Sequence, residues 1–138
     1  MPTYARRVYL SVTSDDITPD EITRALSLAP DESVVRGSVR PGSMNRRPSQ
    51  FHAWNRGFKG GPDVDIGTLL RDMYEMLKQV VDRIQELNRM GCRVTLRIVL
   101  YHAADDTGSR GFDIEVPLLQ LLARIGASID VDQYLLIE

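Results

Sequence analysis

The fold is decided by residues 4–30, YARRVYLSVTSDDITPDEITRALSLAP, in which one predicted strand leads into one predicted helix. The first part alternates apolar with polar residues, and a period of two is typical of a half-buried strand. The apolar side of this alternation consists of Val8, Leu10 and Val12. Thr18 and Glu21 then form the Thr-x-x-Glu pattern of a capping box, which predicts that a helix begins there. Pro30 stops this helix.

The rest of the chain also consists of segments with either the period of two of a strand or the 3.6-residue period of a helix. A helical pattern starts at Asp65 and continues for about 24 residues, which corresponds to about 36 Å of helix. A compact helix opens at Pro117 and ends at Gly126. Strands are predicted at residues 33–39, 50–55, 92–102, 112–116 and 128–137. Glycines and prolines between residues 41 and 62 indicate loops on both sides of the 50–55 strand.

The predicted order is β-α-β-β-α-β followed by β-α-β. The first six elements match the split βαβ, or ferredoxin-like, arrangement, in which both helices lie on one face of an antiparallel sheet. The C-terminal β-α-β would extend both layers. We therefore expect a single α+β domain over residues 1–138, with a mostly antiparallel sheet and its helices on one face.

The composition is that of an ordinary soluble protein, with 43% hydrophobic and 26% charged residues. No apolar run approaches the roughly 20 residues that span a bilayer, and the first residues resemble a strand more than a signal peptide. The single cysteine, Cys92, cannot form an internal disulfide and is expected to be a small buried residue. These features predict a cytoplasmic protein that does not bind membranes.

Several segments occur in a characteristic order along the chain. They are Thr18, Leu26-Ser27-Leu28-Ala29-Pro30, Gly37, Trp54, Leu122-Ala123-Arg124-Ile125-Gly126-Ala127 and Asp130-Val131-Asp132-Gln133-Tyr134. Together they resemble the bacterial family catalogued as domain of unknown function 4279, over nearly the whole chain. The resemblance implies a small bacterial cytosolic α+β domain without an established activity. Some members look like immunity or interaction proteins, and the family supplies no catalytic residue to carry over.

The strongest functional lead is a basic stretch. Residues 33–62 contain six basic residues and no acidic one, although the net charge of the chain is -2. Such a stretch attracts an acidic surface, so we predict that it binds an acidic protein partner. The candidate binding residues are Arg40, Arg46, Arg47, His52, Trp54, Arg56 and Lys59. The sequence predicts that the arginines at 40, 46 and 47 lie on an exposed loop between the second and third strands.

Three alternatives remain open. The basic 36–59 stretch and nearby aromatic residues could bind nucleic acid, although SQFHAWN lacks the Lys/Arg-Gly-Phe/Tyr start of an RNA-recognition motif. The arginines could instead pair with the acidic residues of their own domain. A small enzyme could use Asp130, Asp132 or His102, but no activating motif surrounds them, and no metal or cofactor is expected. The favoured hypothesis is a non-enzymatic interaction module, in its narrower form an immunity-type inhibitor.

Overall fold

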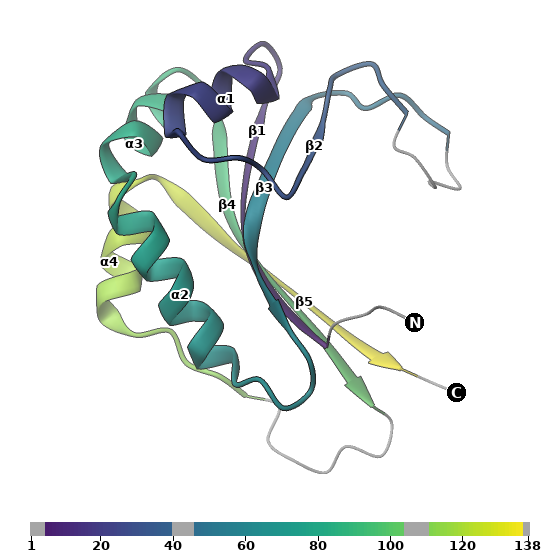
Figure 1. Ribbon diagram of the computed structural model, residues 1–138, viewed down its shortest axis with the longest axis vertical. Coiled ribbons are helices and arrows are strands. Elements are labelled where there is room, and N and C mark those ends of the chain that lie inside the picture. The colour runs from purple at the N-terminus through teal and green to yellow at the C-terminus, as the bar shows by residue number, and fades with distance from the viewer. Residues whose placement is uncertain (1–4, 40–45, 104–110, 137–138) are drawn as a thin grey trace.

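The computed structural model describes residues 5–39, 46–103 and 111–136. Within these ranges the chain forms five strands and four helices (Figure 1). In chain order they are β1 (Arg6–Ser14), α1 (Pro19–Leu26), β2 (Glu32–Val34), β3 (His52–Gly60), α2 (Ile66–Lys78), α3 (Val81–Arg89), β4 (Arg93–Ala103), α4 (Val116–Arg124) and β5 (Ala127–Leu136). The predicted α+β class is confirmed.

β1 and α1 lie where the sequence predicts them. The apolar residues Val8, Leu10 and Val12 are all buried. At the start of α1, the Thr18 hydroxyl accepts a hydrogen bond from the Glu21 N–H, and the Glu21 carboxylate accepts one from the Thr18 N–H, both at 3.2 Å. The predicted capping box is therefore confirmed.

The five strands form one sheet in the order β2-β3-β1-β4-β5. Neighbouring strands are antiparallel except β4 and β5, which are parallel. The predicted mostly antiparallel sheet is thus wrong, because the sheet is mixed. The reason is the position of α4, which follows β4 and carries the chain back across the sheet before β5 begins, so β5 runs in the direction of β4.

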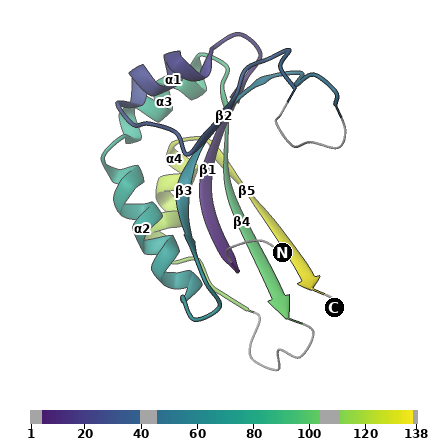
Figure 2. The ribbon, with the colours of Figure 1, turned by 45° about the vertical axis from the view of Figure 1, so that its right-hand side comes forward.

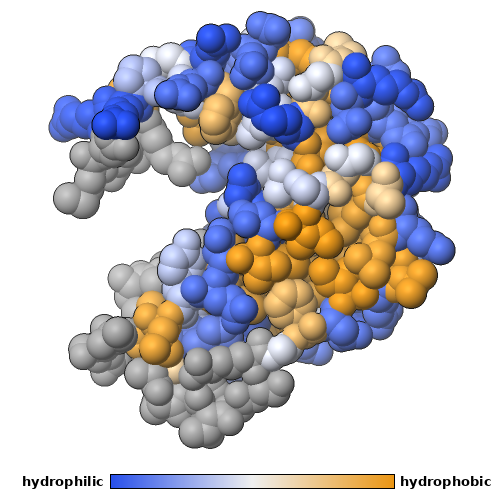
Figure 3. Space-filling view, turned by 180° about the vertical axis from the view of Figure 1, so that it is seen from behind, coloured by the Kyte–Doolittle hydropathy of each residue, from blue (hydrophilic) through white to orange (hydrophobic). Residues whose placement is uncertain are grey.

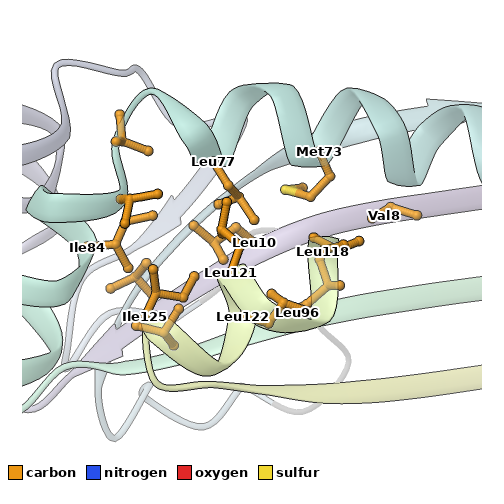
Figure 4. Packing of buried hydrophobic residues seen from close by; sticks show 14 of the residues in the cluster. Val8, Leu10, Met73, Leu77, Ile84, Leu96, Leu118, Leu121, Leu122 and Ile125 are labelled. Atoms are coloured by element: carbon orange, nitrogen blue, oxygen red, sulfur yellow. The ribbon is translucent and has the colours of Figure 1, made fainter. Parts of the chain in front are cut away.

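The helices lie on one face of the sheet, as the sequence predicts (Figure 2). Apolar side chains from the sheet and the helices form a single core between the two layers. Figure 4 shows how Leu10 of β1, Leu77 of α2 and Leu122 of α4 approach one another in this core. The longest helix among the described residues has 13 residues, and none is long and apolar enough to cross a membrane.

The predicted helix of about 24 residues is divided into α2 and α3, so that prediction is wrong. Val80 leaves the helical conformation, with φ -127° and ψ 13°. Val80 and Val81 are adjacent β-branched residues, a combination that weakens a helix. The apolar residues on both sides of the break remain buried, so the i, i+3, i+4 pattern continues across it and hides it from sequence analysis.

β3 is longer than predicted and continues through Gly57 to Gly60. A side chain at Gly57 would overlap the Val8 carbonyl oxygen of β1, so glycine is required there by the close approach of two strands and not by a turn. The short strand predicted at residues 112–116 is wrong, because residues 112–115 are not in a strand and Val116 already begins α4. The alternation in that segment arises because Phe112 and Ile114 pack against the core.

Candidate interaction surface on the open face of the sheet

One face of the sheet carries none of the described helices, and we call it the open face. On β1 its side chains alternate with the buried Val8, Leu10 and Val12, and the strand register extends the face to the neighbouring strands. In Figure 2 the helices lie on one side of the sheet, and the described parts of the connection between β2 and β3 project toward the other side. The open-face residues include Arg7, Tyr9, Ser11, Asn55, Lys59, Thr95, Arg97, Tyr101, Ser128, Asp130, Asp132 and Tyr134.

A row of polar residues crosses the open face from one edge strand to the other. The register places Glu32, Asn55, Ser11, Thr95 and Ser128 side by side on the five strands. Asn55 donates its side-chain amide to Glu32 Oε1 at 2.9 Å, but its own Oδ1 is buried and has no donor among the described residues. A buried acceptor without a donor costs about 1–3 kcal/mol, so Asn55 lowers the stability of the sheet at this row.

Aromatic and charged side chains flank the polar row. The Arg7 guanidinium lies over the Tyr9 ring, 3.9 Å from its centroid. Tyr101 and Tyr134 stack across β4 and β5 with their ring centroids 5.1 Å apart. One face of each of these three rings is therefore covered by a neighbouring side chain.

The same part of the face carries an ion pair. Arg97 donates to Asp130 at 2.5 Å, and the two side chains are 35% and 42% exposed. The open face therefore presents charges of both signs around stacked rings.

The connection between β2 and β3 forms an extension that we call the basic arm (residues 35–51, with 40–45 outside the described ranges). Its two sides are joined by hydrogen bonds from the Gly37 N–H to the Ser49 carbonyl and from the Ser49 N–H to the Ser38 carbonyl, both at 2.8 Å. Arg46 and Arg47 are exposed on this arm, as predicted. Arg40 lies outside the described residues.

The other predicted binding residues are not brought together. Trp54 is fully buried on the helix side of β3, and its indole N–H donates to Thr23 at 3.1 Å. His52 is buried, and its Nδ1 accepts a hydrogen bond from the Arg36 N–H at 3.0 Å. Arg56 also lies on the helix side, whereas Lys59 is exposed on the open face. A buried tryptophan is not available to a partner, so the accessible part of the predicted site is smaller than the sequence suggested.

The described basic residues of this region do not neutralise the acidic residues of the domain. The ion pairs between described residues involve other arginines and lysines, and none includes Arg36, Arg46, Arg47, Arg56 or Lys59. Two of the guanidinium groups bind backbone carbonyls instead, Arg36 that of Asp15 at 3.1 Å and Arg56 that of Ala29 at 2.6 Å.

The residues of the enzyme alternative lie on different sides of the sheet. Asp130 and Asp132 are on the open face, whereas His102 is buried on the helix side and contacts Gln133 Oε1 at 3.2 Å. Within the described residues, no group of three or more His, Cys, Asp and Glu side chains could hold a metal ion. Cys92 is buried, as predicted, and burial raises the pKa of its thiol. A raised pKa disfavours the nucleophilic thiolate.

The helix side carries a polar groove that the sequence did not reveal. It has a volume of about 680 Å³ and lies between the α2–α3 junction and α4. Its basic side chains are already engaged, since Lys78 pairs with Glu75, Arg124 pairs with Asp82 and Arg83 donates to the Leu26 carbonyl. The open face is therefore the better candidate for binding.

The fold and surface define a small α+β domain with a helix-free sheet face and a projecting basic arm. A model of the family described as Domain of unknown function (DUF4279) matches residues 2–136, so the chain belongs to this family. No curated protein and no solved structure matches the chain.

Proposed function

We propose that the protein is a non-enzymatic interaction module that binds an acidic region of a partner protein through its basic arm and open face. The observation that carries this proposal is the absence of described acidic partners around Arg46, Arg47 and Lys59, although the chain has an excess of acids. Basic side chains that are not neutralised internally raise encounter rates with an acidic surface and confer specificity.

A protein partner is favoured over nucleic acid by the state of the aromatic rings. Proteins that bind single-stranded nucleic acid stack bases on exposed ring faces. Here Arg7 covers one face of Tyr9, Tyr101 and Tyr134 stack on each other, and Trp54 is buried. The open face is therefore better suited to hydrogen bonds and ion pairs than to base stacking.

The separation of Asp130 and Asp132 from His102 supports a non-enzymatic role, because a general acid or base and its partner must be within hydrogen-bond reach. The narrower form of the proposal is an immunity-type inhibitor, a single small domain that covers a site on its partner. The lone, buried Cys92 supports a cytoplasmic location.

We also infer that the first four strands and α1 to α3 form a ferredoxin-like unit. The supporting observations are the order β2-β3-β1-β4, its uniformly antiparallel pairing, and the helices on one face. In this description α4 and β5 are an addition to one edge of that unit.

The test compares capture of proteins from the source-cell extract by the wild type and by the Arg46→Ala/Arg47→Ala variant. An acidic partner that binds the wild type should bind this variant about tenfold more weakly, equivalent to about 1.4 kcal/mol. Arg71→Ala/Arg89→Ala removes the same charge from the helix side and should not change binding. Equal binding by both variants would contradict the role of the arm. Oligonucleotide binding with a steep salt dependence would favour the nucleic-acid alternative.

A further inference from the structure

β5 is an edge strand, and the backbone groups on its outer edge pair with no described strand. It is ten residues long and stands at the end of the strand order (Figure 2). Such an edge presents a row of backbone N–H and C=O groups that can pair with another strand. The opposite edge of the sheet differs, because β2 has only three residues.

The helix side of β5 is apolar but incompletely covered. Its apolar residues Ile129, Val131 and Leu135 are 38%, 40% and 51% exposed. On α4, Val116 and Leu119 are also exposed. Figure 3 shows apolar side chains gathered over α4 and β5 on the face seen from behind. Contiguous exposed apolar surface next to a free strand edge is typical of an interface.

The open-face side of β5 carries the charges that a partner must accommodate. Asp130 is paired with Arg97, whereas Asp132 forms no ion pair with a described residue. Tyr134 follows on the same face. Like charges directly opposite one another destabilise a strand pair, so the positions of Asp130 and Asp132 restrict the possible registers.

We propose that the outer edge of β5 pairs with β5 of a second copy of this chain in a two-fold symmetric dimer. Two-fold symmetry makes the two strands antiparallel and the interface self-complementary. The sheet of each copy then continues into the other, and the apolar residues of both β5 strands cover one another.

Only one register of the two β5 strands gives favourable side-chain pairs over most of their length. When Gln133 lies on the two-fold axis, Val131 faces Leu135 of the second copy and Asp132 faces its Tyr134, whose hydroxyl can donate to a carboxylate. Placing Asp132 on the axis would bring Asp132 opposite itself. Placing Val131 there would bring Asp130 opposite Asp132. Placing Tyr134 there would shorten the described ladder and separate Val131 from Leu135.

The first experiment measures the molar mass by light scattering over a range of protein concentrations. The wild type is expected to form a dimer of twice 15.6 kDa. Val131→Lys/Leu135→Lys should be monomeric and should still unfold in one cooperative transition, because both side chains are already exposed. Met90→Lys, at a more exposed apolar position directly after α3, should remain dimeric. A wild type that is monomeric throughout, or a dimer that survives the double substitution, overturns the proposal.

The second experiment tests the register and does not depend on the lysine variants. Gln133→Cys places two thiols opposite each other at the axis, so mild oxidation should form an intermolecular disulfide. Asp132→Cys, which faces Tyr134 in this register, should cross-link much more slowly. The buried Cys92 should not contribute. Fast cross-linking by Asp132→Cys and none by Gln133→Cys contradicts the proposed dimer. Because this interface uses the edge of β5, its failure would leave the proposed role of the basic arm unaffected.

Discussion

Trp54 of β3 donates its indole N–H to the Thr23 hydroxyl of α1 at 3.1 Å, and this bond joins the sheet to the first helix. Trp54 is fully buried and pairs with Val12 in the strand register. A buried N–H without an acceptor costs about 1–3 kcal/mol, so the hydroxyl has a structural role that its partly exposed position on α1 does not suggest.

Thr23→Val should lower the free energy of unfolding by about 1–2 kcal/mol, because it leaves the Trp54 N–H without an acceptor while preserving side-chain volume. In a Trp54→Phe background the same substitution should cost much less, since the donor is then absent. Chemical denaturation of the four proteins, followed by circular dichroism, measures the coupling. Equal costs in both backgrounds would show that the hydrogen bond contributes nothing.

Gly57→Ala should destabilise the protein by about 3 kcal/mol or more, because the added carbon overlaps the Val8 carbonyl and the β1 backbone must move. Gly61 is the matched control, since an added carbon there meets nothing within 4 Å. Gly61→Ala should leave the unfolding midpoint nearly unchanged. Similar midpoints for the two variants would mean that β3 and β1 can separate at Gly57 at little cost.

The sequence predicts the elements whose local signals agree with their tertiary environment. The capping box at Thr18 and the alternation of β1 and β4 are examples, and both are confirmed. Gly57 misleads because a glycine required by strand packing looks the same in sequence as a glycine in a loop. The break at Val80 is hidden because the buried residues keep their spacing across it.

The candidate surface could be predicted only in part. The exposed arginines of the basic arm follow from composition, since their segment contains no acidic residue. The stacking of Tyr101 on Tyr134 does not follow from composition, because it depends on the parallel pairing of β4 with β5. The burial of Trp54 likewise depends on which side of β3 faces the helices. Strand order and register are non-local, so a sequence pattern alone does not determine them.

The capping box should make stability depend on pH through Glu21. Hydrogen bonds from the Thr18 backbone N–H and then from its hydroxyl lower the pKa of this carboxyl below its usual value of 4.5. A lowered pKa in the folded state contributes stability that is fully present above the unfolded pKa and is lost as the pH falls through the folded pKa. The stability advantage of the wild type over Glu21→Gln should therefore shrink as the pH falls below 4.5. Asp20→Asn, in the same turn but without these bonds, is the control, and an advantage independent of pH would contradict the prediction.

Arg46→Ala/Arg47→Ala should leave the unfolding midpoint nearly unchanged. Both side chains are exposed and form no ion pair with a described residue, and even an exposed pair would contribute only about 0–1 kcal/mol. Arg56→Ala provides the contrast, because Arg56 is partly buried and donates to the Ala29 carbonyl at 2.6 Å. Its loss should cost about 1 kcal/mol. Denaturation followed by the fluorescence of Trp54 measures both changes. If the double variant unfolds much more easily than the wild type, the arm arginines have a structural role, and the proposed binding of an acidic partner loses its main support.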